Sequence, residues 1–214
     1  MSNLVFLEPN CIKAVPFTTS KVIAEFTMVG HRHIKKQISL HKSSLETFGL
    51  LVAHETESTG GRPEEIALLN EQQATLLVTF LKNTPVVVSF KTELVRQFYE
   101  MRTELQKRQI GKLELKPTRR TLTDEIQGNP EHGKWDYKLF TDLAYKTATG
   151  KIASTLRKDR GASKKAVALD YMTSEEISLV EKLTYKIAVL YESGFNYYQI
   201  KALLLERKMI GKAV

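Results

Sequence analysis

Two short amphipathic helices joined by a tight turn are predicted within residues 18–42, and this pair constrains the fold more than any other part of the chain. The first follows a Thr-Thr-Ser segment, whose hydroxyl groups can cap a helix, and its apolar residues are spaced to face a core. The turn is expected at Val29-Gly30. In the second helix Ile34 and Ile38 lie one turn apart, so both helices are predicted to pack on one core as a helix-turn-helix.

The second helix carries basic and hydrogen-bonding side chains on its remaining faces. A recognition helix needs this combination, because one face packs inward while Lys and Arg meet phosphates and other donors meet base edges. The alternative is a solvated basic helix in an ordinary α-helical domain, since Lys and Arg are common on exposed helix faces. A net charge of +8 over 214 residues favours a polyanionic partner without requiring one.

Two apolar runs, residues 50–55 and 65–69, flank a strong turn signal at 58–63 and predict a β-hairpin. A hairpin directly behind a helix-turn-helix is typical of the wing of a winged-helix module. Arg62 at its tip would then reach a phosphate. The alternative is a hairpin that only covers the core.

Helical periodicity dominates the next part of the chain. Asn70 is placed to cap a helix over 71–81, and a second apolar stripe predicts a helix from residue 86 to about residue 109. Residues 111–133 combine basic side chains with Gly and Pro. We interpret this segment as an interdomain linker with a short helix at 123–127.

The pattern beyond the linker is again helical, with a capping-box start at Thr173 and Glu176. The predicted fold class is therefore mainly α with a small β-hairpin. Its parts are expected to be an N-terminal winged helix-turn-helix domain over 1–110, the linker over 111–133, and a C-terminal helical domain for oligomerisation or interaction over 134–214.

No residue pattern typical of catalysis or metal binding is present in the sequence. Gly60-Gly61 lacks the Lys-Ser/Thr pair that follows a phosphate-binding loop. His31 and His33 are two residues apart, a spacing that suits no helical metal pair. Cys11 has no apparent base partner and, as the single cysteine, excludes an internal disulfide. We therefore expect no enzyme activity, no cofactor and no metal.

The sequence predicts a cytoplasmic protein without membrane contact. It has no run of about eighteen apolar residues, which a transmembrane helix requires. Its N-terminus lacks the basic and apolar regions of a signal peptide. The use of one cysteine is consistent with a reducing compartment.

Several segments, in their order along the chain, resemble the phage regulatory protein Rha family over roughly residues 14–108. These segments are Thr19-Ser20-Lys21-Val22-Ile23-Ala24-Glu25, His31-Arg32-His33 with Ile34 and Ile38, Gly61-Arg62-Pro63, and Phe98-Tyr99-Glu100-Met101. The second half is similar to the C-terminal domain of phage antirepressor-type proteins, among others through Arg120-Thr121-Leu122-Thr123-Asp124 and Asp170-Tyr171-Met172-Thr173. The resemblance implies a phage or prophage regulator in a bacterial host cell. It also implies an N-terminal module that binds DNA and a C-terminal domain that oligomerises or contacts a repressor or host protein.

The predicted function is transcription control through binding of double-stranded DNA by the helix-turn-helix. The residues expected at the DNA are Thr19, Ser20, His31, Arg32, His33, Lys35, Lys36, Gln37, Ser39, Lys42 and Arg62. The alternative is an antirepressor that inactivates a phage repressor by binding it, and the two functions can coexist. A homodimer is expected, because single winged modules rarely bind tightly alone.

Overall fold

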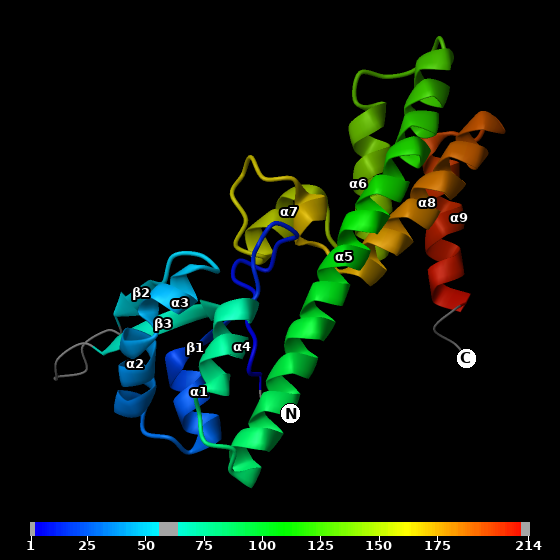
Figure 1. Ribbon diagram of the computed structural model, residues 1–214. Helices are drawn as coiled ribbons and strands as arrows, with labels where there is room; N and C mark the ends of the chain where they lie inside the picture. Colours follow the sequence, from blue (N-terminus) through cyan, green and yellow to red (C-terminus); the bar gives the residue numbers. More distant parts are fainter. Residues whose placement is uncertain (1–2, 56–63, 211–214) are drawn as a thin grey trace. The chain divides into compact units, whose positions relative to one another are not determined.

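The computed structural model describes residues 3–55 and 64–210 and divides into two compact units (Figure 1). Unit 1 comprises Met1–Glu8 and Ala14–Thr103, and unit 2 comprises Pro9–Lys13 and Glu104–Val214. The fold is mainly helical with a small antiparallel sheet, which confirms the predicted fold class at that level. Within the described ranges, no helix is long and apolar enough to cross a membrane.

Unit 1 combines a three-stranded sheet with short helices. Its elements are β1 (Phe17–Thr19), α1 (Ser20–Thr27), α2 (His31–Leu40), α3 (Lys42–Glu46), β2 (Val52–Glu55), β3 (Glu65–Asn70), α4 (Glu71–Thr79) and the first part of α5 (Pro85–Gly128). The strands pair antiparallel in the order β1-β3-β2, with Thr18 opposite Leu69 and Ala53 opposite Ala67. The two arms of the predicted hairpin are therefore β2 and β3, and the segment that joins them at 56–63 lies outside the described residues.

The core of unit 1 joins the predicted helix pair to the later elements. Ile23 of α1 and Ile34 of α2 are fully buried, together with Leu69 of β3, Leu77 of α4 and Leu94 of α5. Each side chain of this size contributes roughly 1.5–3 kcal/mol when it leaves water. The apolar stripes of α1 and α2 thus hold the helix pair on the rest of unit 1.

Local capping sets the starts of α1 and α4. Thr19 Oγ1 accepts a hydrogen bond from Val22 N at 3.1 Å. Asn70 Oδ1 accepts from Gln73 N at 2.9 Å, and Gln73 Oε1 accepts from Asn70 N at 3.1 Å, which makes a complete capping box. Gln73 is itself buried and also donates to the Gly49 carbonyl, so the same box holds the loop before β2. The predicted cap at Asn70 is confirmed.

The turn between α1 and α2 differs in detail from the prediction. Its left-handed residue is Met28, with φ 57°, whereas Gly30 has φ −53° and begins α2 as its N-cap. A left-handed conformation is costly for a residue with a Cβ atom. Met28 N–H and Val29 N–H both bond to carbonyls of the last turn of α1, which offsets part of this cost.

Unit 2 has helices joined by loops in its described residues, together with the non-helical segment Pro9–Lys13. The helices are the remainder of α5, then α6 (Asp136–Thr149), α7 (Ala153–Asp159), the 3₁₀ helix η1 (Ala168–Tyr171), α8 (Ser174–Glu192) and α9 (Tyr197–Ile210). Phe140 of α6 and Ile187 of α8 lie in one buried cluster, and Leu156 of α7 and Ile177 of α8 lie in another. The predicted capping box at Thr173 and Glu176 is present and starts α8.

The prediction of a linker at 111–133 is wrong for most of that segment, because α5 continues without interruption to Gly128. Leu115, Leu122 and Ile126 of this part are buried in the clusters of unit 2, and their burial outweighs the weak helix preference of Gly111 and Pro117. The glycine also has a packing role, since a Cβ there would lie 3.0 Å from Ile177 Cγ2.

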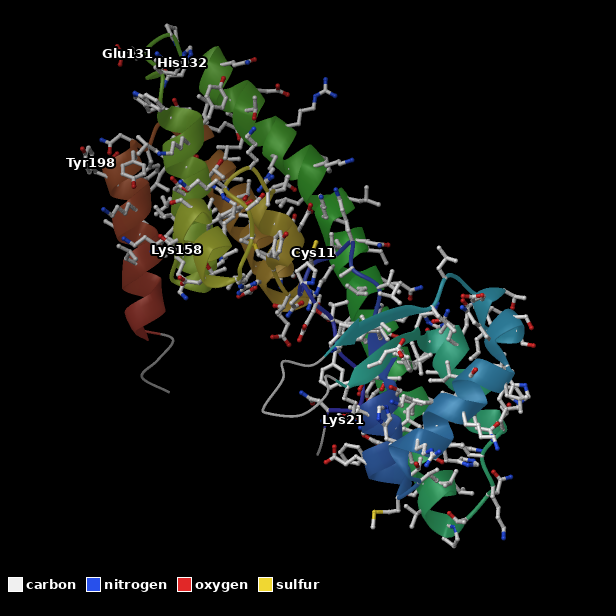
Figure 2. All side chains as sticks on the ribbon, turned by 90° about the vertical axis from the view of Figure 1, so that its left-hand side faces the viewer. Cys11, Lys21, Glu131, His132, Lys158 and Tyr198 are labelled. Carbon is white, nitrogen blue, oxygen red and sulfur yellow. The ribbon has the colours of Figure 1, made fainter. Side chains whose placement is uncertain are left out.

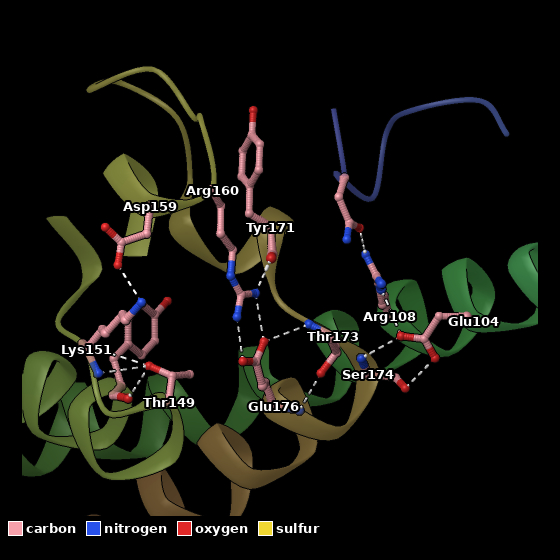
Figure 3. Close-up of polar contacts among 12 residues, drawn as sticks. Glu104, Arg108, Thr149, Lys151, Asp159, Arg160, Tyr171, Thr173, Ser174 and Glu176 are labelled. Atoms are coloured by element: carbon pink, nitrogen blue, oxygen red, sulfur yellow. Dashed lines mark hydrogen bonds and ion pairs between the residues drawn. The ribbon is translucent and has the colours of Figure 1, made fainter. Parts of the chain in front are cut away.

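A polar framework ties the start of α8 to the rest of unit 2 (Figure 3). Arg160 donates two hydrogen bonds to Glu176, at 2.8 and 2.5 Å, and a further one to the Tyr171 carbonyl. Glu104 of α5 accepts from Ser174 N at 2.9 Å and from Ser174 Oγ at 2.6 Å. The segment between α7 and α8 is thereby anchored at both ends by charge-assisted hydrogen bonds.

Candidate nucleic-acid interface

Helix α2 has one face in the core and one face in solvent. Ile34 is fully buried and Ile38 packs against the same cluster. Arg32 and Lys36 project from the opposite side and are exposed. The helix carries three Lys or Arg side chains and no carboxylate, so its outer face is positive.

The cations of this face are largely unneutralised. Arg32 and Lys36 form no ion pair with a described residue, and Lys42, just after α2, is 3.8 Å from Glu46 in an exposed i,i+4 pair. Exposed pairs of this kind contribute little and are screened by salt. A polyanion would therefore meet three exposed cations on Arg32, Lys36 and Lys42.

The start of α2 is fixed by a hydrogen-bond network that links three elements of unit 1. His31 Nδ1 is 2.6 Å from Glu64 Oε1, and His31 Nε2 is 2.9 Å from Ser20 Oγ. Ser20 Oγ accepts from Ala67 N at 3.0 Å. With the ring proton on Nδ1, that N–H donates to Glu64 and the Ser20 hydroxyl donates to Nε2. We call these four groups the Ser20–His31–Glu64 network.

Glu64 holds its charge in this network. The hydrogen bond from His31 is the main cause that lowers the pKa of Glu64, burial acts in the opposite direction, and the charges of His31, Lys21 and Lys35 lower it further. Lys21, labelled on α1 in Figure 2, lies 3.7 Å from the second Glu64 oxygen. The carboxylate just before β3 therefore draws the N-terminal ends of α1 and α2 together.

The order serine, histidine, carboxylate is also that of a nucleophilic triad. Ser20, however, is fully buried, and its oxygen already accepts a backbone N–H. A substrate cannot reach a hydroxyl in this position. The network serves the packing of α1, α2 and β3.

The structure separates the residues predicted at the DNA into three groups. Exposed on α2 or just after it are Arg32, His33, Lys36, Ser39 and Lys42, and partly buried beside them are Lys35 and Gln37. Ser20 is buried and His31 is 14% exposed, so the expectation that these two residues face DNA does not fit their internal bonds. Thr19 is partly buried and caps α1 through its oxygen, which leaves its hydroxyl hydrogen to donate, so its place at the DNA stays a prediction. Arg62 lies outside the described residues.

Sequence reasoning missed Glu64 as part of this region. It lies 33 residues from its partner His31 and carries no local motif, so only the folded structure brings the two side chains together. Among the described residues there is also no group of three or more His, Cys, Asp or Glu side chains that could hold a metal ion.

Comparison with known proteins bears on unit 1. Residues 18–103 match the family model described as phage regulatory protein Rha. This confirms the resemblance predicted for the N-terminal part. The match ends at residue 103, so the similarity predicted for the second half stays a prediction. No curated protein matches the chain.

Proposed function

We propose that this chain, a phage regulatory protein by the family of its residues 18–103, binds double-stranded DNA through a winged helix-turn-helix in unit 1 and thereby controls transcription. One observation carries the proposal: α2 is anchored on one side by Ile34 and His31 and presents Arg32 and Lys36 on the other. A rigidly held helix with an unpaired positive face is what reading a DNA groove requires.

The order of elements supports the winged form of this proposal. α1, a short turn and α2 are followed by the antiparallel pair β2 and β3, and β1 completes the sheet beside β3. In such a module the second helix enters the major groove and the hairpin lies along the backbone. The Ser20–His31–Glu64 network then sets the angle between the reading helix and the hairpin.

The side chains on α2 suit two kinds of contact. Arg32 is able to pair with guanine through two parallel hydrogen bonds, and Gln37 with adenine, each worth about 1–3 kcal/mol of discrimination. Lys36 and Lys42 supply phosphate contacts, whose strength falls as salt rises. The proposed role is regulatory and uses no bond-making chemistry.

The test is a salt titration of binding to random-sequence duplex DNA, measured by fluorescence anisotropy on the full chain. Arg32→Ala combined with Lys36→Ala removes two cations from α2. On random-sequence DNA we expect Arg32 as well as Lys36 to meet phosphates, because no cognate guanine is presented. The variant should therefore bind more weakly at every salt concentration, with a slope of log affinity against log salt that is smaller by about 1.8, roughly 0.9 for each lost phosphate contact. Circular dichroism should be unchanged, because both side chains are exposed.

The matched control is Lys116→Ala combined with Lys186→Ala. These two lysines are exposed on α5 and α8 of unit 2, so the control removes the same charge from helices other than α2. The proposal requires that the control binds DNA nearly as the original chain does. Equal loss in both variants would mean that only net charge matters, and unaltered affinity in the α2 variant would refute the assignment.

A second candidate function, binding of a phage repressor or host protein, is favoured by aromatic residues on unit 2. Trp135 is 62% and Tyr198 is 78% exposed. Aromatic side chains are enriched in protein interfaces. Co-elution of a purified phage repressor with the full chain, lost in a Trp135→Ser and Tyr198→Ser variant, supports this function. If the repressor does not co-elute and the chain does bind duplex DNA, the result supports DNA binding and not repressor binding.

A further inference from the structure

Unit 2 contains a cavity of about 350 Å³ between α5, α6, α7, η1 and α8. Its polar lining includes Arg119 of α5, Arg157 of α7 and Tyr145 of α6. No Asp or Glu is among the described residues that line it. Two arginines thus line one cavity, and no carboxylate among the described residues lines it with them.

Of the two arginines, Arg157 gives the stronger indication of a bound anion. Its side chain is partly buried, yet it makes no hydrogen bond or ion pair with a described residue. The acidic side chains of this region are already paired with other cations: Asp159 pairs with Lys151, and Glu176 pairs with Arg160 (Figure 3). A partly desolvated guanidinium without an anion is costly, and a bound anion would remove that cost.

Arg119 is held in place but retains free donors. It donates one hydrogen bond to the Tyr145 hydroxyl at 2.6 Å, and its guanidinium carbon lies 5.7 Å from the centre of the same ring. The remaining N–H groups of Arg119 have no acceptor among the described residues. Because the Tyr145 hydroxyl accepts from Arg119, its own hydrogen is left to donate.

The other lining residues divide into hydroxyl groups and an apolar wall. Thr123 and Thr141 are also lining residues and carry hydroxyl groups that can donate. Leu122, Ile126 and Ala153 form apolar surface in the same cavity. The cavity is within the size range of small-molecule sites and much larger than an inorganic anion needs.

We propose that this cavity binds a small organic phosphate, with the phosphate between Arg119 and Arg157 and an apolar or aromatic body against Leu122, Ile126 and Ala153. A phosphate monoester is favoured over a carboxylate, because its charge of about −2 matches two guanidinium groups and its three terminal oxygens accept from several donors at once. Binding at this site would allow a small molecule to modulate the regulatory protein. It does not depend on DNA binding by unit 1.

The electrostatics of the rim favour entry of an anion. Lys158, next to Arg157 on α7, is exposed and points to the surface (Figure 2). Lys164 and Lys165 are exposed in the loop that leads from α7 to the lining residue Val167. Positive charge around a concave site raises the local concentration of anions and the rate of association.

The experiment is isothermal titration calorimetry of the full chain with adenosine monophosphate, uridine monophosphate, inorganic phosphate and, as the uncharged match, adenosine. We expect binding of at least one monophosphate, weaker binding of inorganic phosphate, and none of adenosine at the same millimolar concentrations. Arg157→Gln should weaken binding about ten- to a hundred-fold, as should Arg119→Gln, since each removes charged hydrogen bonds to the ligand.

Lys158→Gln is the matched control, because it removes the same charge from the next position on α7 without touching the cavity lining. It should change the affinity by less than about three-fold, the range of a screened surface charge. Arg157→Gln removes no side-chain hydrogen bond or ion pair with a described residue, so the fold of this variant should persist by circular dichroism even where Arg119→Gln unfolds through loss of the Tyr145 bond.

Three results would overturn the proposal. The first is no binding of any phosphate probe at millimolar concentration. The second is equal affinity for adenosine and its monophosphate, which would make the cavity an apolar site. The third is a loss of duplex DNA binding in Arg157→Gln without any binding of the small phosphates, which would make Arg157 a contact for a polynucleotide.

Discussion

The Ser20–His31–Glu64 network is expected to stabilise unit 1, and His31→Ala tests it. The substitution removes the acceptor of a hydroxyl that is fully buried, while Ser20 Oγ still accepts from Ala67 N. Leaving one buried polar group without its partner costs about 1–3 kcal/mol. The same substitution also frees the carboxylate before β3 from α2. We expect the free energy of unfolding of unit 1 to fall by that amount.

The assay is urea unfolding of the full chain, followed by far-ultraviolet circular dichroism and by tryptophan fluorescence. The single tryptophan, Trp135, lies in unit 2, so its fluorescence reports that unit, whereas circular dichroism reports both. Hydrogen exchange at the Ala67 amide gives a local readout. Both His31→Ala and Ser20→Ala should speed that exchange, since the amide depends on the Ser20 oxygen and on its position.

The control is His33→Ala on the same helix. His33 is exposed and its one side-chain contact, with Gln37, is long at 3.4 Å, so its loss should change stability by less than about 0.5 kcal/mol. A double-mutant cycle between Ser20→Ala and His31→Ala should give a coupling of roughly 0.5–3 kcal/mol. A coupling near zero, or equal effects of His31→Ala and His33→Ala, would refute the network as a source of stability.

Three further predictions concern the backbone and the carboxylates. Met28→Gly should raise the free energy of unfolding of unit 1, measured in urea, by about 1 kcal/mol, because Met28 has a left-handed backbone that glycine adopts without strain. The side chain is 83% exposed, so its removal gives up little buried surface. An unchanged or lower stability would contradict this. Gly111→Val should destabilise unit 2 by about 1–3 kcal/mol, because the new Cβ would lie 3.0 Å from Ile177 Cγ2. Gly128→Ala should not destabilise it, because a Cβ at position 128 has no neighbouring atom within 4 Å. Unit 2 should lose stability as the pH falls below the ordinary carboxylate pKa. Burial raises the pKa of both Glu104 and Glu176, but hydrogen bonds outweigh this effect, so both pKa values are lowered overall. Glu104 accepts these bonds from Ser174 and Arg108, and Glu176 accepts them from Arg160 and Thr173. A carboxylate whose pKa is lower in the folded than in the unfolded state stabilises the fold at a pH above the unfolded-state pKa. This stabilisation is lost as the pH falls through the folded-state pKa. In a variant with Glu104→Gln and Glu176→Gln, the free energy of unfolding of unit 2 should depend less on pH in the acid range. Unfolding is followed by Trp135 fluorescence, and an unchanged pH dependence in the variant would contradict the assignment.

Interactions within a few residues could be predicted from the sequence. The cap of α4 at Asn70 and the capping box of α8 at Thr173 were both predicted, and both are present. Such caps join groups two or three positions apart, so their geometry follows from the helix itself. The apolar spacing of Ile34 and Ile38 predicted which face of α2 packs inward for the same reason.

The path of α5 could not be predicted in the same way. Gly111 and Pro117 carry a local preference against a helix, and together with the basic residues around them they were interpreted as a linker. In the structure Leu115, Leu122 and Ile126 are buried against helices that start many residues later. Burial of three large side chains outweighs a local preference of a few kcal/mol, but only when those partners are in place.

For the candidate interface, the sequence by itself determined the composition of α2: a positive helix with one apolar stripe and an N-terminal cap on the helix before it. Tertiary structure alone decided which of its polar residues remain exposed. Ser20 and His31 look as suitable for DNA as Arg32 does in the sequence, yet both bond inward, because Glu64 and the Ala67 amide meet them from 33 and 47 residues away. Hydrogen bonds over such separations depend on the packed core that aligns α1, α2 and β3, and no local pattern encodes them.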